Sequence, residues 1–173
     1  MFDIKINVVN WLARYHQVNE QDFRNALKDE KATSYLLIWS IFEQRIFNGF
    51  MKVEIINNTS QKFEKHYSSL DIDSIAQKFH TRYQNKEHYQ HLIHSKDNIT
   101  FRSIINMPFE NISEFEKLQM LFFIVYRYRN NIFHGNKKVL TWTKYTEQIE
   151  DCLLFITRII DLNQKEMIIE FQK

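Results

Sequence analysis

Hydrophobic residues recur along most of the chain with the 3.6-residue period of an amphipathic helix. The first strongly periodic segment covers residues 19–47, with apolar positions at i, i+3, i+4, i+7 and i+11: Tyr35, Ile38, Trp39, Phe42 and Ile46. Before it, the apolar positions of residues 2–8 alternate, which fits a strand as well as the frayed start of a helix. Residues 56–69 are polar and lack a period, so they are predicted to form a loop.

Two more periodic segments predict helices in the middle and at the end of the chain. One begins at Asp71 or Asp73, either of which can cap a helix N-terminus, and runs to about Ile93. The other begins near Thr141. Its apolar stripe is Trp142, Tyr145, Ile149, Cys152, Leu153, Ile156 and Ile160.

The helix between these two has the clearest sequence boundaries. Ser113 and Glu116 form an S-x-x-E capping box, in which each residue bonds the backbone N–H of the other. Gly135 stands where a left-handed C-cap residue belongs, and Pro108 ends any helix that precedes this one. The apolar side of the helix is Phe115, Leu118, Phe122, Val125 and Ile132.

These segments predict one all-α domain over residues 1–173, an up-and-down four-helix bundle with extra short helices. The composition agrees, because 2 Gly and 1 Pro in 173 residues are too few for the turns of a many-stranded sandwich or barrel. A hydrophobic content of 44% and a net charge of +2 argue against disorder.

Other classes of protein are excluded on similar grounds. No apolar run reaches the ~18 residues of a membrane span, and residues 1–10 do not have the pattern of a secretory signal. The single cysteine, Cys152, cannot form an intramolecular disulfide or a cysteine-rich zinc site. We therefore expect a cytoplasmic protein with no membrane partner.

Four histidines, His80, His88, His91 and His94, crowd the second predicted helix. His91 and His94 could share one helix face, but His88 lies about 120° away from His94, so a third zinc ligand is missing there. A solvated histidine-rich helix is the favoured interpretation, and neither a metal nor a cofactor is predicted.

Positive charge is concentrated around the end of the third helix. Residues 117–146 contain no Asp or Glu and carry six cations, Lys117, Arg127, Arg129, Lys137, Lys138 and Lys144. This segment is therefore +6 and the other 143 residues are −4, since the whole chain is +2. Such a field attracts phosphates, although cations at a helix end can also simply complement the helix dipole.

The same segment contains Arg129, then Asn130, and after three more residues His134 followed by Gly135. From the residue counts, about 0.03 Arg-Asn-x3-His combinations are expected by chance in a chain of this composition. A looser Arg82-x5-His88 pair lacks the Asn and any helix-end signal, and we interpret it as surface.

Arg129-Asn130-x3-His134 at the end of an apolar helix resembles the signature of the HEPN superfamily. The resemblance implies a four-helix domain, and many members are metal-independent RNases of toxin–antitoxin, CRISPR and antiphage systems. A second likeness is Glu43, at the place where many members carry an acidic or polar residue facing the motif. Asn136 is a departure, because some toxin members carry there a tyrosine that a partner nucleotidyltransferase modifies.

The resemblance implies Arg129, His134 and Asn130 as catalytic residues, with Glu43 in support. His can serve as general acid or base near neutral pH, and Arg presents a planar fork of donors to phosphate oxygens. Attack by the 2′-OH would restrict cleavage to RNA, and by resemblance it would leave 2′,3′-cyclic phosphate and 5′-hydroxyl ends. The candidate RNA-binding residues are Arg127, Tyr128, Lys137 and Lys138.

A spacing of five residues places Arg129 and His134 about 140° apart around an ideal helix and about 7.5 Å apart along it. A twofold homodimer could bring two copies of each into one cleft, so we predict a composite site at a homodimer interface. Glu43 is expected to pair with Arg129, or else to reach solvent or a different base. If the chain is a toxin, an antitoxin or defence-complex partner should block the cleft.

Two other functions remain open at this stage. One is a HEPN-like module that binds RNA or a nucleotide, or senses a partner, without cleaving. The other is a plain helical dimerisation domain, in which Arg129 caps carbonyl groups and His134 is a C-terminal helix residue favoured by the dipole. The basic segment favours the RNase over the second alternative but does not separate it from the first.

Overall fold

A computed structural model describes the chain except for residues 1–7, 16, 18, 28–29, 134–144 and 170–173. Every regular element among the described residues is helical, and these residues form no strand. The all-α helical bundle is therefore confirmed. The alternating pattern of residues 2–8 lies outside the described residues, except that Val8 begins the first helix.

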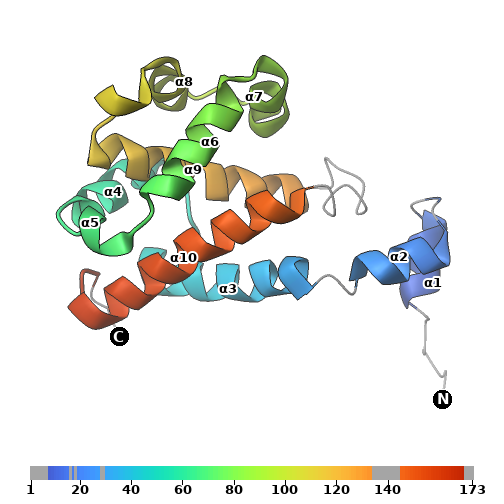
Figure 1. Cartoon of the computed structure of the whole chain (residues 1–173). Coiled ribbons are helices and arrows are strands. Elements are labelled where there is room, and N and C mark those ends of the chain that lie inside the picture. The colour runs from blue at the N-terminus through green and yellow to red at the C-terminus, as the bar shows by residue number, and fades with distance from the viewer. Residues whose placement is uncertain (1–7, 16, 18, 28–29, 134–144, 170–173) are drawn as a thin grey trace.

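The α-helices are labelled in Figure 1, and two short 3₁₀ turns stand among them, one before α4 and one before α9. In chain order the elements are α1 (Val8–Tyr15), α2 (Glu20–Leu27), α3 (Glu30–Phe47), η1 (Val53–Ile55), α4 (Ile56–Glu64), α5 (Tyr67–Leu70), α6 (Asp73–Gln84), α7 (Lys86–Ile93), α8 (Ile99–Asn106), η2 (Phe109–Asn111), α9 (Glu114–Phe133) and α10 (Thr146–Glu166).

Helix α9 is the central element of the bundle. Its residues from Leu118 to Val125 are buried except for the half-buried Gln119. Helix α4 packs along α9, α10 packs along α3, and α6, α7 and α8 also contact α9. Figure 1 shows α1 and α2 beyond the N-terminal end of α3, away from the rest of the bundle. The fold thus holds α9 rigidly between the other helices, up to the turn that carries Arg129.

The predicted stripe of the first segment forms the core side of α3. Tyr35, Trp39, Phe42 and Ile46 are buried, and Ile38 packs against them. Phe122 of α9 lies at the centre of an aromatic cluster, with ring centroids 5.1 to 6.3 Å from those of Phe42, Phe47, Phe63 and Phe155. This cluster joins α3, α4, α9 and α10.

The predicted loop at residues 56–69 is wrong, because α4 and α5 occupy it. The buried residues of α4 do have helical spacing: Ile56, Thr59, Ser60 and Phe63. Two of these positions hold hydroxyl residues, so the hydrophobic residues alone do not show a helical period in this part of the sequence. The Thr59 hydroxyl donates to the carbonyl of Ile55 at 2.9 Å, one turn back along the chain, so its polar group is satisfied inside the bundle.

The single helix predicted from residue 71 or 73 to 93 is two helices, α6 and α7, which meet at Asn85. Asn85 is extended, and its side-chain oxygen accepts hydrogen bonds from the N–H groups of Glu87 and His88, so it caps α7. Asp71 is the left-handed residue that ends α5, and Asp73 lies in the first turn of α6. Neither acts as the predicted side-chain N-cap.

The predicted capping box at the start of α9 is confirmed. Glu116 N donates to Ser113 Oγ at 3.2 Å, and Ser113 N donates to Glu116 Oε2 at 2.9 Å. The start of the last helix was predicted near Thr141, which lies outside the described residues, as do Trp142 and Gly135. Within the described part, the stripe of α10 buries Ile149, Cys152 and Ile156 as predicted.

Replacing Ser113 by Ala should destabilise the protein by about 0.5–2 kcal/mol, because the N–H of Glu116 loses its capping acceptor. Urea unfolding followed by circular dichroism measures this change. Ser103→Ala is a suitable control, since Ser103 is exposed within α8 and should change stability by no more than about 0.5 kcal/mol. Equal effects of the two substitutions would show that the capping box contributes nothing.

Asp73 forms a polar contact between α5, α6 and α9. Its Oδ1 accepts hydrogen bonds from Lys117 Nζ at 2.7 Å and from the Tyr67 hydroxyl at 2.9 Å. The hydrogen bond from Lys117 is the main cause that lowers the pKa of the Asp73 carboxyl, and the bond from Tyr67 adds to it. The folded state therefore favours the ionised carboxylate more than the unfolded chain does.

The stability contributed by Asp73 should depend on pH. A lowered folded pKa stabilises the protein above the unfolded value of about 3.9, and this contribution disappears as the pH falls through the folded pKa. Asp73→Asn should therefore cost up to about 1 kcal/mol at pH 7, because the Asp73 side chain is 59% exposed and solvent screens its ion pair, and much less near pH 3. Urea unfolding of both proteins at the two pH values measures the difference. A cost independent of pH would contradict this account.

Candidate functional site at the end of helix α9

Arg129 and Asn130 lie on the last turns of α9, directly before the end of its described part at Phe133. Arg129 Nη1 donates a hydrogen bond to Asn130 Oδ1 at 3.0 Å, and both side chains are half-buried. Their neighbours Tyr128 and Asn131 are buried. The Arg-Asn pair therefore sits at the edge of the bundle, where the Asn side chain orients the guanidinium.

Tyrosines from different helices surround this end of α9. The Tyr35 hydroxyl of α3 donates to the carbonyl of Val125 at 2.9 Å, and the Tyr83 hydroxyl of α6 donates to the Tyr128 hydroxyl at 3.1 Å. Burial raises the pKa of the Tyr35, Tyr83 and Tyr128 phenols well above the usual value. These phenols are therefore neutral at physiological pH, and their hydrogen bonds fix the turn that carries Arg129.

The candidate role of Tyr128 in stacking on RNA does not agree with this arrangement. Its ring is buried and packs between Phe79, 6.3 Å away, and Tyr145, 6.4 Å away between ring centroids. The aromatic ring is thus part of the core, and no base can reach its faces. We correct its assignment from RNA contact to structural residue.

Arg127 is also buried, and its guanidinium is occupied. Its Nε donates to the carbonyl of Leu92 at 3.1 Å and its Nη2 to that of Ile93 at 2.8 Å. The side-chain amide of Asn131, one turn later, also donates to Leu92 O, at 3.2 Å. Arg127 and Asn131 therefore hold the C-terminal carbonyls of α7 against α9. Arg127 was predicted to contact RNA at the surface; we correct this to a structural role in which it joins α7 to α9.

The expected ion pair between Glu43 and Arg129 is not formed. Glu43 Oε1 instead accepts the backbone N–H of Met51 at 3.0 Å, after the end of α3. The register of the helices explains the difference. Tyr35 reaches α9 at Val125 and lies close enough to Arg129 to feel its charge, while Glu43 is eight residues farther along α3, or about 12 Å. Glu43 stabilises the turn after α3 rather than the motif.

Among the described residues, the basic segment places less positive charge near the motif than its sequence suggests. Lys117 is 2.7 Å from Asp73 and lies over the ring of Phe109, at the opposite end of α9. Arg127 is buried in the bundle. Among the described cations of residues 117–146, this leaves Arg129 at the edge of the bundle near the motif. His134, Lys137 and Lys138 lie outside the described residues, and their predicted roles stay predictions.

The histidine cluster is dispersed. His80 is buried, with Nε2 3.0 Å from the carbonyl of Met107, and His88 Nδ1 is 3.3 Å from the carbonyl of Arg82. His91 is exposed, and His94 is the left-handed residue that ends α7. Among the described residues, no group of three or more His, Cys, Asp or Glu could hold a metal ion.

A polar groove near the motif was not predicted. It has a volume of about 950 Å³, lies between α6 and the start of α10, and is lined by residues that include both Arg82 and His88. The Arg82 guanidinium carbon is 5.9 Å from the centroid of Tyr145, next to the end of α9. Three carboxylates also line the groove, so it has mixed charge: Glu147, Glu150 and Asp151. No sequence pattern indicates that these two helices leave a groove between them.

None of the helices described has the length and apolar character that crossing a membrane requires. Comparison with family models, curated proteins and solved structures gave no significant match. The likeness to the HEPN superfamily therefore rests on residues of the chain itself: the Arg129-Asn130-x3-His134 spacing at the end of a buried helix.

Proposed function

We propose that the protein is a metal-independent endoribonuclease, a toxin or antiphage-defence component, with a composite Arg129 and His134 site at a homodimer interface. The observation that carries the proposal is the Arg129–Asn130 pair: a guanidinium held at 3.0 Å by the next side chain, at the edge of the bundle and on the last turns of its central helix. The surrounding tyrosines keep that turn in place.

The residues suit cleavage by attack of the ribose 2′-OH on the adjacent phosphorus. In this reaction His134 moves a proton at the attacking or the leaving oxygen. Arg129 stabilises the charge that develops on the phosphorane oxygens, and its orientation by Asn130 before substrate binds lowers the cost of that interaction. The bond to the 5′-oxygen then breaks, which leaves a 2′,3′-cyclic phosphate and a 5′-hydroxyl.

A homodimer supplies what one chain lacks. Within one copy of the motif, the Arg and the His point in different directions if the helix continues to residue 134. Twofold symmetry places the same surface of both copies in contact, so the end of α9 can meet its own equivalent. Lys137 and Lys138 then lie near the RNA backbone in the proposed complex.

Mixing two inactive variants tests the composite site. Arg129→Ala and His134→Ala homodimers should both be inactive, and their subunits should exchange on mild denaturation and refolding. If the site draws Arg from one copy and His from the other, half of the dimers become mixed and regain one intact site, so cleavage returns to about a quarter of the wild-type rate. No recovery in a mixture that contains mixed dimers contradicts a composite site.

The second candidate function is an RNA-binding or nucleotide-binding module that does not cleave. It is favoured by the same orientation of Arg129, since binding needs the cation but not the histidine. In either case, a protein that covers the end of α9 would inhibit the activity, which is how an antitoxin or a defence complex would act.

Incubation of the purified protein with RNA in EDTA separates the two candidates. Structured and unstructured RNAs, tRNA included, should be cut without any added metal, and DNA of the same sequence should remain intact because it lacks the 2′-OH. Salt-sensitive binding of these RNAs without any cutting would replace the nuclease by the binding module. Absence of both binding and cutting would refute both candidates.

A further inference from the structure

The polar groove between α6 and the start of α10 lies beside the motif but contributes no residue to the proposed reaction. We call it the α6–α10 groove. Its volume of about 950 Å³ falls in the range of small-molecule pockets, about 300–1,000 Å³. Arg82 lines it, with its guanidinium carbon 5.9 Å from the ring centroid of Tyr145. That ring lies 6.4 Å from the ring of Tyr128, the residue before Arg129. An RNA strand that passes the motif can therefore also reach the groove.

Two of the three carboxylates that line the α6–α10 groove already have cationic partners. Asp151 Oδ1 is 3.1 Å from Lys78 Nζ, across the groove from α10 to α6. Glu150 forms an ion pair with Lys31 of α3. The charges of these two carboxylates are therefore largely compensated within the protein.

Arg82 and Glu147 also line the α6–α10 groove, and neither forms an ion pair with any residue that the structure describes. Arg82 is half-buried, and its contact with the Tyr145 ring helps to fix the guanidinium. The Tyr83 phenol beside it is neutral and does not compensate its charge. Glu147 is exposed, in the first turn of α10. The groove thus offers the donors of one arginine and the acceptors of one carboxylate.

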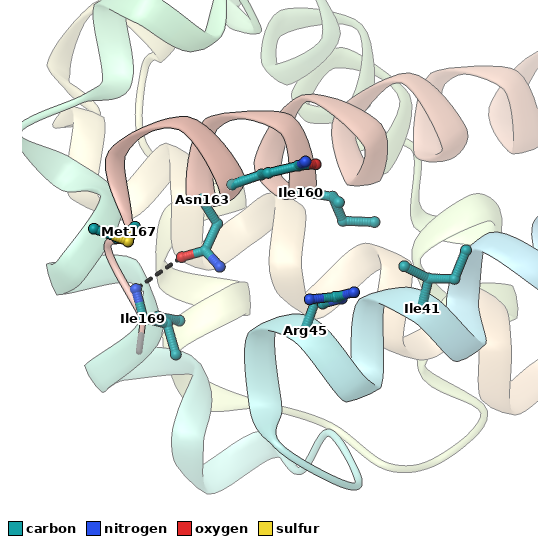
Figure 2. A pocket seen from close by; sticks show the side chains of 7 residues that line it. Ile41, Arg45, Ile160, Asn163, Met167 and Ile169 are labelled. Atoms are coloured by element: carbon teal, nitrogen blue, oxygen red, sulfur yellow. Dashed lines mark hydrogen bonds between the residues drawn. The ribbon is translucent and has the colours of Figure 1, made fainter. Parts of the chain in front are cut away.

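The hollow between α3 and α10, shown in Figure 2, does not have this combination. Its walls are largely apolar, with Ile41 on one side and Ile160 on the other, and no carboxylate is among the described residues that line it. The side-chain oxygen of Asn163 is occupied there, because it accepts the N–H of Ile169 at 2.7 Å. A polar ligand with several donors therefore fits the α6–α10 groove better than this hollow.

The polar groups of the α6–α10 groove suit a nucleobase better than a phosphate. Lys78 and Arg82 face three carboxylates, so the groove has no excess of positive charge. Guanine is the base whose two edges match an arginine and a carboxylate together. Its O6 and N7 accept hydrogen bonds from an arginine fork, and its N1–H and N2–H₂ groups donate to a carboxylate. Adenine carries an amino donor beside N7, which would face the donors of the arginine.

We propose that the α6–α10 groove binds one guanine of the RNA substrate, beside the phosphate that is cut. Arg82 donates to O6 and N7 of the base, and Glu147 accepts from its N1–H and N2–H₂ groups. The inference rests on the proposed function for its substrate, RNA, and adds the base that determines where the RNA is cut. Because these two residues are distinct from Arg129 and His134, base recognition can be measured with RNA that cannot be cut.

Single-turnover cleavage of an oligonucleotide with one guanine, and of the same RNA with adenine at that position, tests the proposal. The cut should map beside the guanine, and the guanine RNA should be cut about 5–150-fold faster, the range for one good bidentate contact. Inosine, which lacks the N2 amino group, and 7-deazaguanine, which lacks N7, should each lose part of this preference. Equal rates for all four RNAs, or a preference for another base, would overturn the proposal.

Two variants connect each analogue to one residue. In Glu147→Gln, the rates for guanine and inosine should differ less than about twofold, and in Arg82→Gln the same should hold for guanine and 7-deazaguanine. Arg102→Gln on α8 and Glu114→Gln, in the first turn of α9, replace exposed residues away from the groove and should keep the wild-type preferences. Analogue effects that persist unchanged in Glu147→Gln and Arg82→Gln would contradict the assignment. The analogues also test the wild-type protein, so the result does not depend on the folding of either variant.

Binding of 2′-O-methyl RNA separates failure of this inference from failure of the proposed function. Such RNA has no 2′-OH to attack the phosphorus, but the wild-type protein should still bind the guanine form more tightly than the adenine form. Cleavage of ordinary RNA without any guanine preference refutes the guanine site and leaves the nuclease. Guanine preference in binding without cleavage refutes the nuclease and leaves the guanine site. Free GMP that binds as tightly as the guanine RNA would overturn the proposal, since it assigns the groove to a free nucleotide.

Discussion

His134→Ala is expected to lower the rate of RNA cleavage by roughly 10²–10⁴-fold, the usual contribution of a general acid or base. The affinity for RNA should change less than about threefold, because a single imidazole contributes little to phosphate binding compared with Arg129 and the lysines. Single-turnover cleavage and filter binding, measured on the same labelled RNA, give the two quantities. The separation of rate from affinity is what distinguishes a proton-transfer role from a binding role.

His91→Ala is the matched control for this substitution. His91 is exposed on α7 and has no place in the proposed site, so its loss should leave both quantities unchanged. An unchanged cleavage rate in His134→Ala would remove His134 from the mechanism. Loss of RNA binding together with cleavage, in a variant that unfolds like the wild type, would assign His134 to binding instead.

Phe122→Ala is expected to have the largest effect on stability, a loss of about 3–5 kcal/mol in the free energy of unfolding. Phe122 is fully buried, and its ring contacts aromatic rings from α3, α4 and α10. Removing it leaves a cavity at the point where these helices meet α9, and the rigid surroundings cannot close it fully. Urea unfolding followed by circular dichroism and by tryptophan fluorescence measures the change.

Phe50→Ala is the control, since Phe50 is 76% exposed and should cost no more than about 0.5 kcal/mol. If Phe122→Ala does not fold, Phe122→Leu keeps the comparison measurable, because it leaves a smaller cavity and should cost less. A cost below about 1 kcal/mol for Phe122→Ala would contradict the central place of this ring in the packing.

The parts of the fold that were predictable are those with strong local signals. The stripe on α3 and the Ser113–Glu116 capping box depend on short spacings, and both are as expected. Helix α4 was missed because Thr59 and Ser60 occupy buried positions that only tertiary packing makes favourable. The break at Asn85 could have been found, since an Asn that caps a helix is a known sequence signal.

For the candidate site too, features with a local sequence signal were predictable, and those that depend on tertiary packing were not. Sequence indicated that Arg129 and Asn130 stand at the end of a buried helix, and it could have indicated that Arg127 points elsewhere. Two residues separated by one position differ by about 200° around a helix, so Arg127 and Arg129 cannot share a face. The partner of Glu43 could not be predicted, because it depends on how far α3 is shifted along α9, and no local pattern encodes that shift.

The chemistry of the new RNA ends is the most direct test of the central claim. RNA cut by the wild-type protein in EDTA can be treated with polynucleotide kinase, with and without its phosphatase activity, and the ends can then be identified by mass spectrometry. The proposed mechanism predicts 5′-hydroxyl and 2′,3′-cyclic phosphate ends, produced without metal. Ends with 5′-phosphate and 3′-hydroxyl groups, or cutting that requires a divalent ion, would contradict cleavage by the 2′-OH at Arg129 and His134.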